Sequence, residues 1–488
     1  MTAPKARTAA VTEHGPDPEA TADARRWKAL AVCLTAGFMT LLDTSIVNVA
    51  LPSMERGLHA SQADLSWVVS GYALTYGLAL VPAGRLGDLR GRRTAFLTGL
   101  ALFTLASAAC GLAPSSGWLV AFRLLQGAAA GFVSPQVSGL IQQLFQGAER
   151  ARAFGMLGST IGISTAVGPL VGGLLIQAFG TDSGWRWVFF VNLPIGAAAF
   201  AAALRLLPRR SAAERRGGEG FDPVGVLLLG LGVVAVMLPL VQEQEWPGRG
   251  KWALVPLGVL LLLAFWLWER RQTDRQHAPL VNVRLFRLRS FSLGALLALV
   301  YFAGFTTVFF VYTLFLQNGL GYSALEAGCA SVPFAVGSAV AAAAGGRLVV
   351  RHGRKLVTFG LLGVALGLTG TIVAVRLVPG PHAAWATALP LLVAGLGSGL
   401  TVSPNTTLTL SEVPVRLAGA AGGVLQTSQR IGSAAGIAAV GAVFFAHVGN
   451  HDHWADALQL GLLTALGFVV VALVAAVLDL RAEARQRA

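Results

Sequence analysis

Long apolar segments recur along this chain of 488 residues, and they limit what it can fold into. A helix of about 20 apolar residues, rising about 1.5 Å per residue, crosses the hydrocarbon core of a bilayer. Charged residues, prolines and glycines separate fourteen such segments, at residues 29–51, 64–84, 94–113, 117–143, 152–179, 186–207, 223–242, 252–269, 290–317, 325–349, 355–377, 384–411, 417–446 and 457–480. The sequence therefore predicts an all-α polytopic membrane protein with fourteen transmembrane helices.

Composition and charge exclude several other classes of protein. Only 12% of the residues are charged, whereas soluble domains carry about 25%. The net charge of +14 would suit nucleic acid if the basic residues gathered on a soluble face, but they are spread between the spans. Cys33, Cys110 and Cys329 lie in or beside apolar segments, which favours small buried side chains over a disulfide framework or a metal site. We therefore expect no nucleic acid partner, no metal and no cofactor.

The distribution of lysine and arginine fixes the expected orientation. An even number of spans places both termini on the same side of the membrane. Thirty of the 37 basic residues fall in the tails and in the alternate loops that begin with the loop at Arg85, whereas the opposite loops hold five. Arg123 and Arg430 lie within spans. The positive-inside rule therefore places both termini in the cytoplasm, for a multi-pass protein of the cell inner (cytoplasmic) membrane.

Two cytoplasmic loops share one sequence pattern. The first reads "GRLGDLRGRR" at residues 84–93, and the second reads "GRLVVRHGRK" at residues 346–355, eight spans later. One such loop could owe its glycines and arginines to its position alone, but two copies at matching positions favour an internal repeat. If each half has six spans, an offset of eight means that two further helices lie between the halves. This 6 + 2 + 6 arrangement with parallel repeats is one that secondary transporters use.

The repeat predicts the domain organisation of the chain. The expected units are a cytoplasmic tail at 1–28, an N-terminal six-helix bundle at 29–207, cytoplasmic linkers with two extra transmembrane helices at 208–289, a C-terminal six-helix bundle at 290–480 and a cytoplasmic tail at 481–488.

The repeated loops are candidates for a gate on the cytoplasmic side. Their glycines permit a tight turn between closely packed helices. Asp88 with neighbouring arginines would form a charge latch that holds this side shut, and the latch would be asymmetric because the second copy has Val350 in place of Asp88. The expected gating residues are Gly84, Arg85, Gly87, Asp88, Arg90, Gly91, Arg92, Arg93, Arg347, Gly353 and Arg354.

Several motifs in the N-terminal half point to one family. The loop at 84–93 resembles the loop between spans 2 and 3 of the major facilitator superfamily. Four further segments resemble motifs of its fourteen-span drug:proton antiporter branch, the EmrB/QacA type: "LDTSIVNVALP" at 42–52, "RLLQGAAAG" at 123–131, "GSTIGISTAVGPLVGG" at 158–173 and "WRWVFFVNLPIG" at 185–196.

The C-terminal half resembles the same branch more loosely. "LQTSQRIGSAAG" at 425–436 is similar to its glycine-containing span 13, although Gln429 and Arg430 stand in the reverse of an order also seen in the branch, so a role for Arg430 stays open. The resemblance as a whole implies the major facilitator fold and the export of drugs in exchange for protons.

Asp43 and Arg123 are the candidate residues for proton coupling. Asp43 lies about 22 Å into the first span from the cytoplasm, and Arg123 lies about 9 Å below the outer surface, so the two have about the same depth. The resemblance implies that their spans line one wall of the cavity. A charge within a span costs at least about 2.5 to 3.5 kcal/mol on insertion scales, which favours a functional role with a named partner. The alternative is a static ion pair that orders the bundle.

The fifth predicted span is rich in glycine. Gly158 and Gly162, and then Gly168 and Gly172, form two pairs of small residues four apart, and Pro169 can bend the helix. We expect close packing against the other half, as alternating access requires, although dense glycine also serves simple helix packing. The expected residues of this antiporter-motif helix are Gly158, Gly162, Gly168, Pro169, Gly172 and Gly173.

The expected substrate cavity has few polar residues. Tyr301, Phe305, Phe309 and Tyr312 follow helical spacing, so they form either a wall of the cavity or part of the bundle core. As a wall they would suit bulky apolar compounds through stacking and cation–π attraction. Further candidates are Trp67, Tyr72, Gln126 and Asn405. We expect no further membrane-buried acid in the C-terminal half, which favours monovalent or neutral hydrophobic substrates.

Proton-coupled efflux of hydrophobic drugs or antibiotics by alternating access is the leading functional hypothesis. We expect a non-enzymatic, monomeric transporter whose partners are a small hydrophobic substrate, protons and the lipid bilayer. The chain has no "GxxxxGK[ST]" loop for ATP-driven pumping, and the histidines of "HVGNHDHW" at 447–454 are expected to be an exposed loop without a metal. A proton symporter or uniporter for a small metabolite, and a non-transporting membrane receptor or scaffold, are the alternatives.

Overall fold

The computed structural model describes residues 18–180, 182–209, 220, 222–242, 246, 248, 250–275, 279–448 and 454–487. Within these ranges every regular element is a helix, and fourteen helices are long and apolar enough to cross a membrane. This confirms the all-α fold class and the predicted number of spans. Residues 1–17 of the predicted N-terminal tail and most of the predicted linker at 210–219 lie outside the described residues.

Seven helices form the first six spans. Their bounds are α1 Pro18–Leu58, α2 Gln62–Arg90, α3 Arg92–Gly111, α4 Ser116–Leu144, α5 Gly147–Phe179, α6 Trp185–Phe190 and α7 Asn192–Leu206. The sixth span consists of two helices, α6 and α7, which meet at Val191 and Asn192. Buried alanines, phenylalanines and leucines of α1 to α5 and α7 make up most of a common core.

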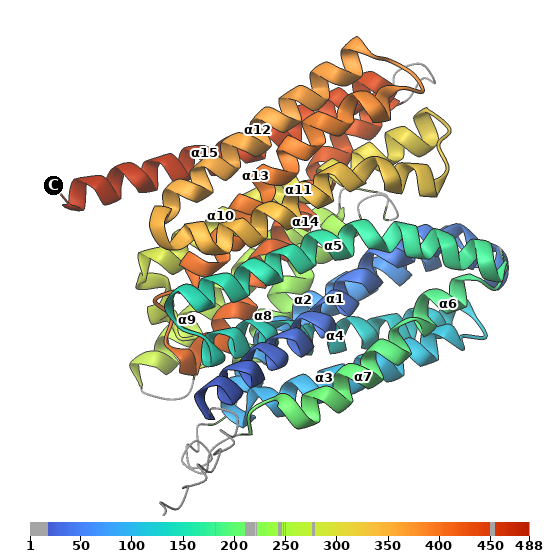
Figure 1. Cartoon of the computed structure of the whole chain (residues 1–488). Coiled ribbons are helices and arrows are strands. Elements are labelled where there is room, and N and C mark those ends of the chain that lie inside the picture. The colour runs from blue at the N-terminus through green and yellow to red at the C-terminus, as the bar shows by residue number, and fades with distance from the viewer. Residues whose placement is uncertain are drawn as a thin grey trace, which may run out of the picture.

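The last six spans form a second bundle. Their helices are α10 Arg289–Leu314, α11 Ala324–His352, α12 Arg354–Leu377, α13 Ala383–Thr409, α14 Ala418–Val448 and α15 Trp454–Arg487. A π-helical turn, Phe315–Gly319, continues α10 at its C-terminal end. The start of α1 and the end of α15 both lie at the left of Figure 1, as an even number of spans requires.

The two repeated loops follow helices that also begin alike. Ser61 caps α2 and exchanges hydrogen bonds with Asp64, and Ser323 caps α11 and does the same with Glu326. Such capping boxes satisfy the free N–H groups of a helix start. Each helix ends at a glycine with positive φ, 104° at Gly91 and 53° at Gly353, where the next helix begins directly. Side chains with a Cβ rarely adopt this backbone conformation, so glycine makes the tight turn possible.

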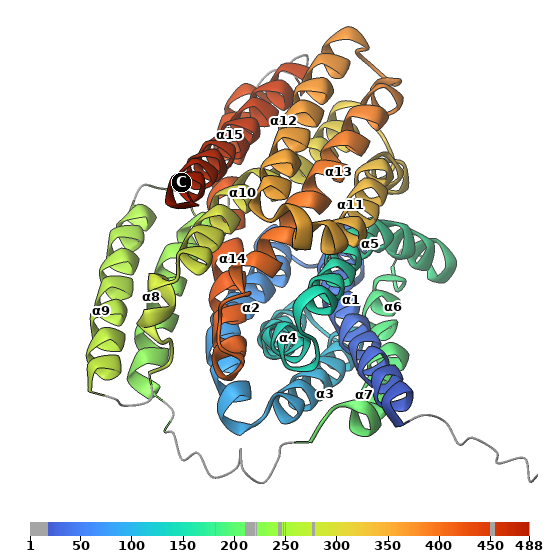
Figure 2. The same cartoon turned by 60° about the vertical axis from the view of Figure 1, so that its left-hand side comes forward.

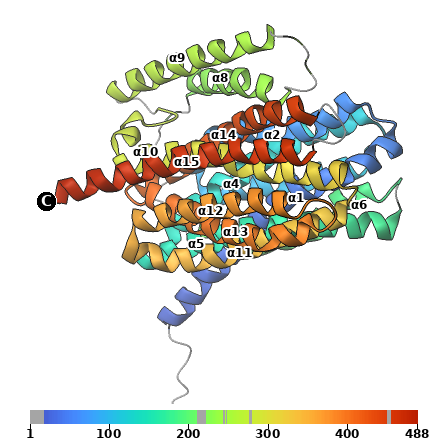
Figure 3. The same ribbon diagram turned by 90° about the horizontal axis from the view of Figure 1, so that it is seen from above.

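Two further helices lie at the edge of the assembly, α8 Pro223–Val241 and α9 Leu254–Asp274. Figure 3 shows them side by side along one edge of the other spans. Val233 and Met237 of α8 pack against Leu74 of α2 and Ala434 of α14, so α8 contacts both bundles. A short 3-10 helix, η2, spans Gly250–Ala253 before α9, and another, η3, spans Val283–Arg287 between α9 and α10.

The two bundles meet mainly along two pairs of helices, α2 with α14 and α5 with α11 (Figure 2), and α4 with α14 and α5 with α13 add smaller contacts. A Cβ on Gly84 of α2 would lie 2.2 Å from the carbonyl oxygen of Gly419, and a Cβ on Gly346 of α11 would lie 2.6 Å from that of Ala151. Both contacts lie near the cytoplasmic ends of the helices. The backbones of the two bundles therefore touch on the cytoplasmic side, and this side is closed in the structure.

Candidate functional site

Asp43 lies in the middle of α1 and is fully buried within the N-terminal bundle. One of its carboxylate oxygens, Oδ2, accepts a hydrogen bond from Nη1 of Arg123 at 2.6 Å. The other, Oδ1, accepts from Nε2 of Gln126 and from Nδ2 of Asn192, each at 2.9 Å. The predicted partners Asp43 and Arg123 are thus brought together, and two amides complete the shell around the carboxylate.

Arg123 is as deeply buried as its partner, with 1% of the residue exposed. Its Nε donates to the carbonyl oxygen of Val68 at 3.0 Å, and its Nη1 also donates to Oε1 of Gln126 at 2.8 Å. The guanidinium carbon lies 4.1 Å from the ring centroid of Tyr72, a cation–π geometry. A buried ion pair is tolerated when hydrogen bonds satisfy its donors and acceptors, and these contacts engage Nε and Nη1 of Arg123 and both carboxylate oxygens of Asp43.

Asn192 and Ser107 extend the network to two more spans. Nδ2 of Asn192 also donates to Oγ of Ser107 at 3.0 Å, and that hydroxyl donates to the carbonyl oxygen of Phe189 at 2.9 Å. Both side chains are completely buried. Sequence analysis missed these two residues, although the lone amide of Asn192 in the apolar segment "WRWVFFVNLPIG" was a signal.

The site can therefore respond to movement between spans. The carboxylate belongs to α1, two of its donors belong to α4 and the third belongs to α7. A shift of one helix against the others changes which donors reach Asp43. Such a change alters the relative stability of the charged and neutral forms of a carboxyl, which is what a proton carrier requires.

Asp88, near the end of α2, joins the two bundles on the cytoplasmic side. Its Oδ1 accepts from the backbone N–H of Gly419 at 3.0 Å, and its Oδ2 accepts from that of Ala420 at 2.9 Å. These N–H groups belong to the first turn of α14, where a carboxylate also interacts favourably with the helix dipole. Arg92 donates to the same carboxylate at 2.9 Å, and to the carbonyl oxygen of Gly139 at 3.0 Å.

The other residues of the first loop surround this contact. A Cβ on Gly87 would overlap the amide of Gln136, and Arg85 is buried. Arg93 donates to the carbonyl oxygen of Leu204 at 2.7 Å, whereas the side chain of Arg90 is exposed. Of these arginines, Arg92 forms an ion pair with Asp88.

Within the described residues, no side chain of the second loop forms a hydrogen bond or ion pair across the bundles as Asp88 does. Nε of Arg354 lies 2.8 Å from Oδ2 of Asp479 in α15, and Arg289 of α10 lies 2.7 Å from Oδ1 of the same carboxylate. Arg354 also donates to the carbonyl oxygen of Ser290 at 3.0 Å. Arg347 is exposed. The arginine that pairs in the second copy therefore binds helices of its own bundle, whereas Gly346 touches α5 of the other bundle. The expectation of no further buried acid in the C-terminal half is wrong, because Asp479 of the last span is buried and holds these arginines.

The glycines of α5 divide into two groups. A Cβ on Gly158 or Gly162 would contact Ala342 or Ala339 of α11, so the cytoplasmic half of α5 packs against the other bundle as expected. A Cβ on Gly168 or Gly172 would instead contact Ser45 or Ile46 of α1. The expectation that all these glycines face the other bundle is wrong for Gly168 and Gly172, because α5 crosses α1 there.

Pro169 and Gly173 also lie in the outer half of α5, but they face α11. A Cβ on Gly328 of α11 would lie 2.9 Å from Cβ of Pro169, and a Cβ on Gly173 would have only Leu325 nearby, at 3.8 Å. The proline ring takes the space that Gly328 leaves open. These two residues therefore belong to the outer end of the bundle interface.

A small apolar cavity lies between α5 and the helices α10, α11 and α13. Phe305 and Phe309 line it, together with Phe302 and Phe334, which sequence analysis did not select. Its volume of about 20 Å³ holds roughly one water molecule. Ligand pockets for drug-sized molecules measure about 300 to 1,000 Å³, so the cavity is nearly closed in this conformation.

Tyr301 and Tyr312 do not line this cavity with Phe305 and Phe309. Both are fully buried in the core of the C-terminal bundle, and the hydroxyl of Tyr312 lies 2.6 Å from Oγ1 of Thr387. The predicted aromatic face therefore does not line one cavity. Its two tyrosines pack toward α12, α13 and α15, whereas its two phenylalanines face the cavity beside α5.

The remaining cavity candidates also lie elsewhere. Tyr72 and Gln126 belong to the buried network around Asp43, and Asn405 donates to the carbonyl oxygen of Gly294 at 3.0 Å within the C-terminal bundle. Trp67, on α2, is half-buried. None of these four residues lines the cavity between α5 and the C-terminal bundle.

Arg430 contacts the opposite bundle. Its guanidinium carbon lies 4.4 Å from the ring centroid of Tyr76 on α2. The hydroxyl of Tyr76 donates to Oγ of Ser134 at 2.7 Å and reaches Oε1 of Gln426 at 3.5 Å. The arginine whose role the sequence left open thus belongs to the interface between the bundles.

No group of three or more histidine, cysteine, aspartate or glutamate side chains within the described ranges could hold a metal ion. His451, Asp452 and His453 of the outer loop lie outside the described residues.

Comparisons with known proteins agree with this architecture. Residues 33–437 match the sequence model of the Major Facilitator Superfamily. A probable actinorhodin transporter of Streptomyces coelicolor is 38% identical over 453 residues, which cover 91% of this chain and 77% of that protein. A tetracenomycin C resistance and export protein of Streptomyces glaucescens is 33% identical, over 89% of this chain and 79% of that protein.

A solved structure has the same fold. The proton:xylose symporter XylE superimposes with a TM-score of 0.65 at 14% sequence identity, over 92% of this chain and 95% of that one.

Proposed function

This chain belongs to the major facilitator superfamily, and from that premise we propose that it exports antibiotic-like small molecules across the cytoplasmic membrane in exchange for protons. Its relatives include an antibiotic resistance and export protein and a probable antibiotic transporter, each matched over most of both chains. Export of such compounds is therefore the function that these similarities support.

The enclosed carboxylate of Asp43 is the observation that carries the proton-coupled part of the proposal. A carboxyl group buried in a span, with its donors on other spans, is arranged to change its protonation when those spans move. In our proposal Asp43 takes up the proton, and Arg123 holds the position of the carboxylate and offsets its charge. The drive available from the membrane potential is about 2.3 kcal/mol per charge per 100 mV.

Alternating access would require the cytoplasmic contact to open. In our proposal, the bonds from Asp88 to the first turn of α14 hold this side closed, and they break when the bundles rock so that substrate can enter from the cytoplasm. The glycine contacts between α5 and α11 would allow the bundles to stay close during this motion.

The apolar cavity lined by Phe302, Phe305, Phe309 and Phe334 would receive the substrate once the bundles separate. Aromatic rings with few polar groups favour hydrophobic compounds. The proposal describes a monomer without a cofactor and without a chemical reaction on its substrate.

Drug susceptibility in a bacterial host that lacks its own efflux pumps tests this function. Wild-type protein should raise the inhibitory concentration of one or more antibiotics in a broad panel, and Asp43→Asn should abolish that protection. Glu412→Gln, at an exposed acid between α13 and α14, is the control for loss of a carboxylate and should behave as wild type.

Two results would count against the proposal. Equal susceptibility with and without the wild-type protein, at confirmed expression in the membrane, would contradict drug efflux. Full protection by Asp43→Asn, together with proton movement that still accompanies transport in vesicles, would contradict the role of Asp43 in proton coupling and leave export itself standing.

A further inference from the structure

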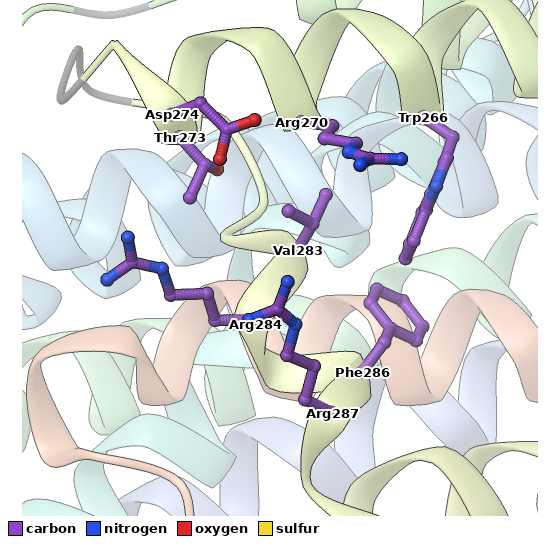
Figure 4. A pocket seen from close by; sticks show the side chains of 8 residues that line it. All are labelled: Trp266, Arg270, Thr273, Asp274, Val283, Arg284, Phe286 and Arg287. Atoms are coloured by element: carbon purple, nitrogen blue, oxygen red, sulfur yellow. The ribbon is translucent and has the colours of Figure 1, made fainter.

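A basic pocket lies outside the transport pathway, between the end of α9 and η3. Figure 4 shows Trp266, Arg270 and Asp274 on the α9 side, with η3 across from them carrying Arg284 and Arg287. The cavity has a volume of about 360 Å³. The proposed function makes no use of it.

The charges of this pocket favour an anion. Three arginines, Arg270, Arg284 and Arg287, stand against one carboxylate, that of Asp274. All three arginines are exposed, and within the described residues none of them forms an ion pair. Guanidinium groups bind phosphate oxygens through paired N–H donors.

An aromatic pair closes one side of the pocket. The rings of Trp266 and Phe286 meet edge to face, with centroids 5.1 Å apart. Phe286 in turn packs on Phe291 of α10 at 5.3 Å, so η3 is fixed against the transmembrane helices. Tryptophan is characteristic of the membrane interface, which agrees with the position of the pocket at the cytoplasmic ends of α9 and α10.

An exposed apolar stripe of α9 leads directly to the arginines. Val259, Leu263 and Trp266 are all exposed, and with Arg270 they follow one face of the helix. Because α9 lies at the edge of the protein, this stripe faces the acyl chains of the bilayer. A free phosphate would use only the arginines, whereas a phospholipid would use the arginines and the stripe together.

We propose that this pocket binds the headgroup of an anionic phospholipid of the cytoplasmic leaflet, with the acyl chains along the exposed face of α9. Basic pockets between transmembrane helices on this side of the membrane suit such headgroups. The lipid would tie α9 to η3 and to the start of α10, and so hold the two extra helices against the C-terminal bundle.

Native mass spectrometry of the purified full-length protein tests this site. The probes are dioleoylphosphatidylglycerol, dioleoylphosphatidylcholine and inorganic phosphate, each added alone, and inorganic phosphate is also added to the protein that carries phosphatidylglycerol. Wild-type protein should retain phosphatidylglycerol in preference to phosphatidylcholine. The triple variant Arg270→Gln, Arg284→Gln, Arg287→Gln should bind phosphatidylglycerol more weakly than wild type, by a factor of about ten or more.

A control variant removes the same charge elsewhere on the cytoplasmic side. It changes three exposed basic residues of α7, α11 and α12: Arg205→Gln, Arg351→Gln and Lys355→Gln. This triple control variant should retain the lipid as wild type does. If the triple pocket variant does not fold, Arg287→Gln alone should still weaken retention about fivefold.

Three outcomes would overturn the proposal. Equal loss of lipid from the pocket and control variants would show that only net charge matters. Equal retention of phosphatidylcholine and phosphatidylglycerol would show that the protein does not recognise the anionic headgroup. Displacement of the lipid by millimolar inorganic phosphate, which itself remains bound, would assign the pocket to a free anion. None of these readouts depends on drug transport.

Discussion

The carboxylate of Asp88 in the first bundle accepts the backbone N–H of Ala420 in the second bundle at 2.9 Å, and so closes the cytoplasmic side across 332 residues of sequence. The contact joins the end of α2 to the beginning of α14, two helices that are far apart in the sequence and are brought together by packing. Hydrogen bonds to a charged group contribute about 1.5 to 3 kcal/mol each, so this residue can bias the equilibrium between closed and open forms.

Asp88→Asn should favour the form that is open to the cytoplasm. The amide keeps one acceptor but loses the charge that faces two N–H groups, Arg92 and the dipole of α14. Ser138, buried beside Gly422 at the interface, provides the measurement. The thiol of Ser138→Cys, in a Cys329→Ser background, should react with a thiol reagent about tenfold faster when Asp88→Asn is present.

The control for Asp88→Asn is a variant that loses a charge on the same side of the membrane without changing α14. Glu412→Gln, which loses a charge at an exposed residue of the same side, should leave the reaction rate unchanged. An unchanged rate for Asp88→Asn would mean that the carboxylate does not hold the closed form.

Asn192→Ala should destabilise the protein and weaken export. The change removes a fully buried donor from Asp43 and also removes the hydrogen bond that Oγ of Ser107 accepts. Loss of such a donor costs about 1 to 3 kcal/mol. Thermal unfolding of the detergent-solubilised protein should shift to lower temperature, and Asn48→Ala, an exposed amide of α1, should not shift it. Equal stability of both variants would show that the network around Asp43 is dispensable.

Gly346→Val should block the approach of the two bundles and leave each bundle folded. A Cβ at this position would lie 2.6 Å from the carbonyl oxygen of Ala151, and the backbone there cannot yield without moving α5. We expect loss of transport with normal membrane insertion. Gly467→Val is the control, because a Cβ there meets no atom within 4 Å. Transport by Gly346→Val at the level of Gly467→Val would contradict a need for close approach.

Asp479→Ala should destabilise the C-terminal bundle. It leaves Arg289 and Arg354 without their shared carboxylate, and removal of one partner from a buried ion pair costs about 3 to 5 kcal/mol. Because Arg289 is partly exposed, we expect the low end of this range, about 3 kcal/mol. Urea unfolding followed by circular dichroism measures the loss. A change below about 1 kcal/mol would show that the arginines find water or other partners instead.

The two repeated loops show how far the sequence could predict the site. Matching glycines and arginines indicated that the loops are related, and both do end a helix at a glycine with positive φ. The missing acid at Val350 indicated that the latch would be asymmetric. The replacement partner Asp479 could not be found in this way, because it lies in α15, 125 residues after Arg354, and the packing of three helices brings it there.

The buried network divides in the same way. Asp43 and Arg123 were predicted as partners because a charge in an apolar span is conspicuous and because the two share a depth. Gln126, Asn192 and Ser107 are uncharged, and their roles depend on the rotation of α4, α7 and α3 about their axes. Phe302 and Phe334 were missed in the cavity for the same reason: which face of an apolar helix meets a neighbour is not visible when all its faces are apolar.

The sequence by itself determined the fourteen spans, their orientation, the internal repeat and the conspicuous charges within the membrane. These properties follow from the transfer of each segment into lipid, which depends on the segment's own side chains and on the basic residues beside it. Only the tertiary structure decided which donors surround Asp43, that Asp88 caps α14, that the second loop binds Asp479 and that arginines of α9 and η3 share a pocket. Those contacts join residues far apart in the chain, and their distances are set by helix packing rather than by local sequence.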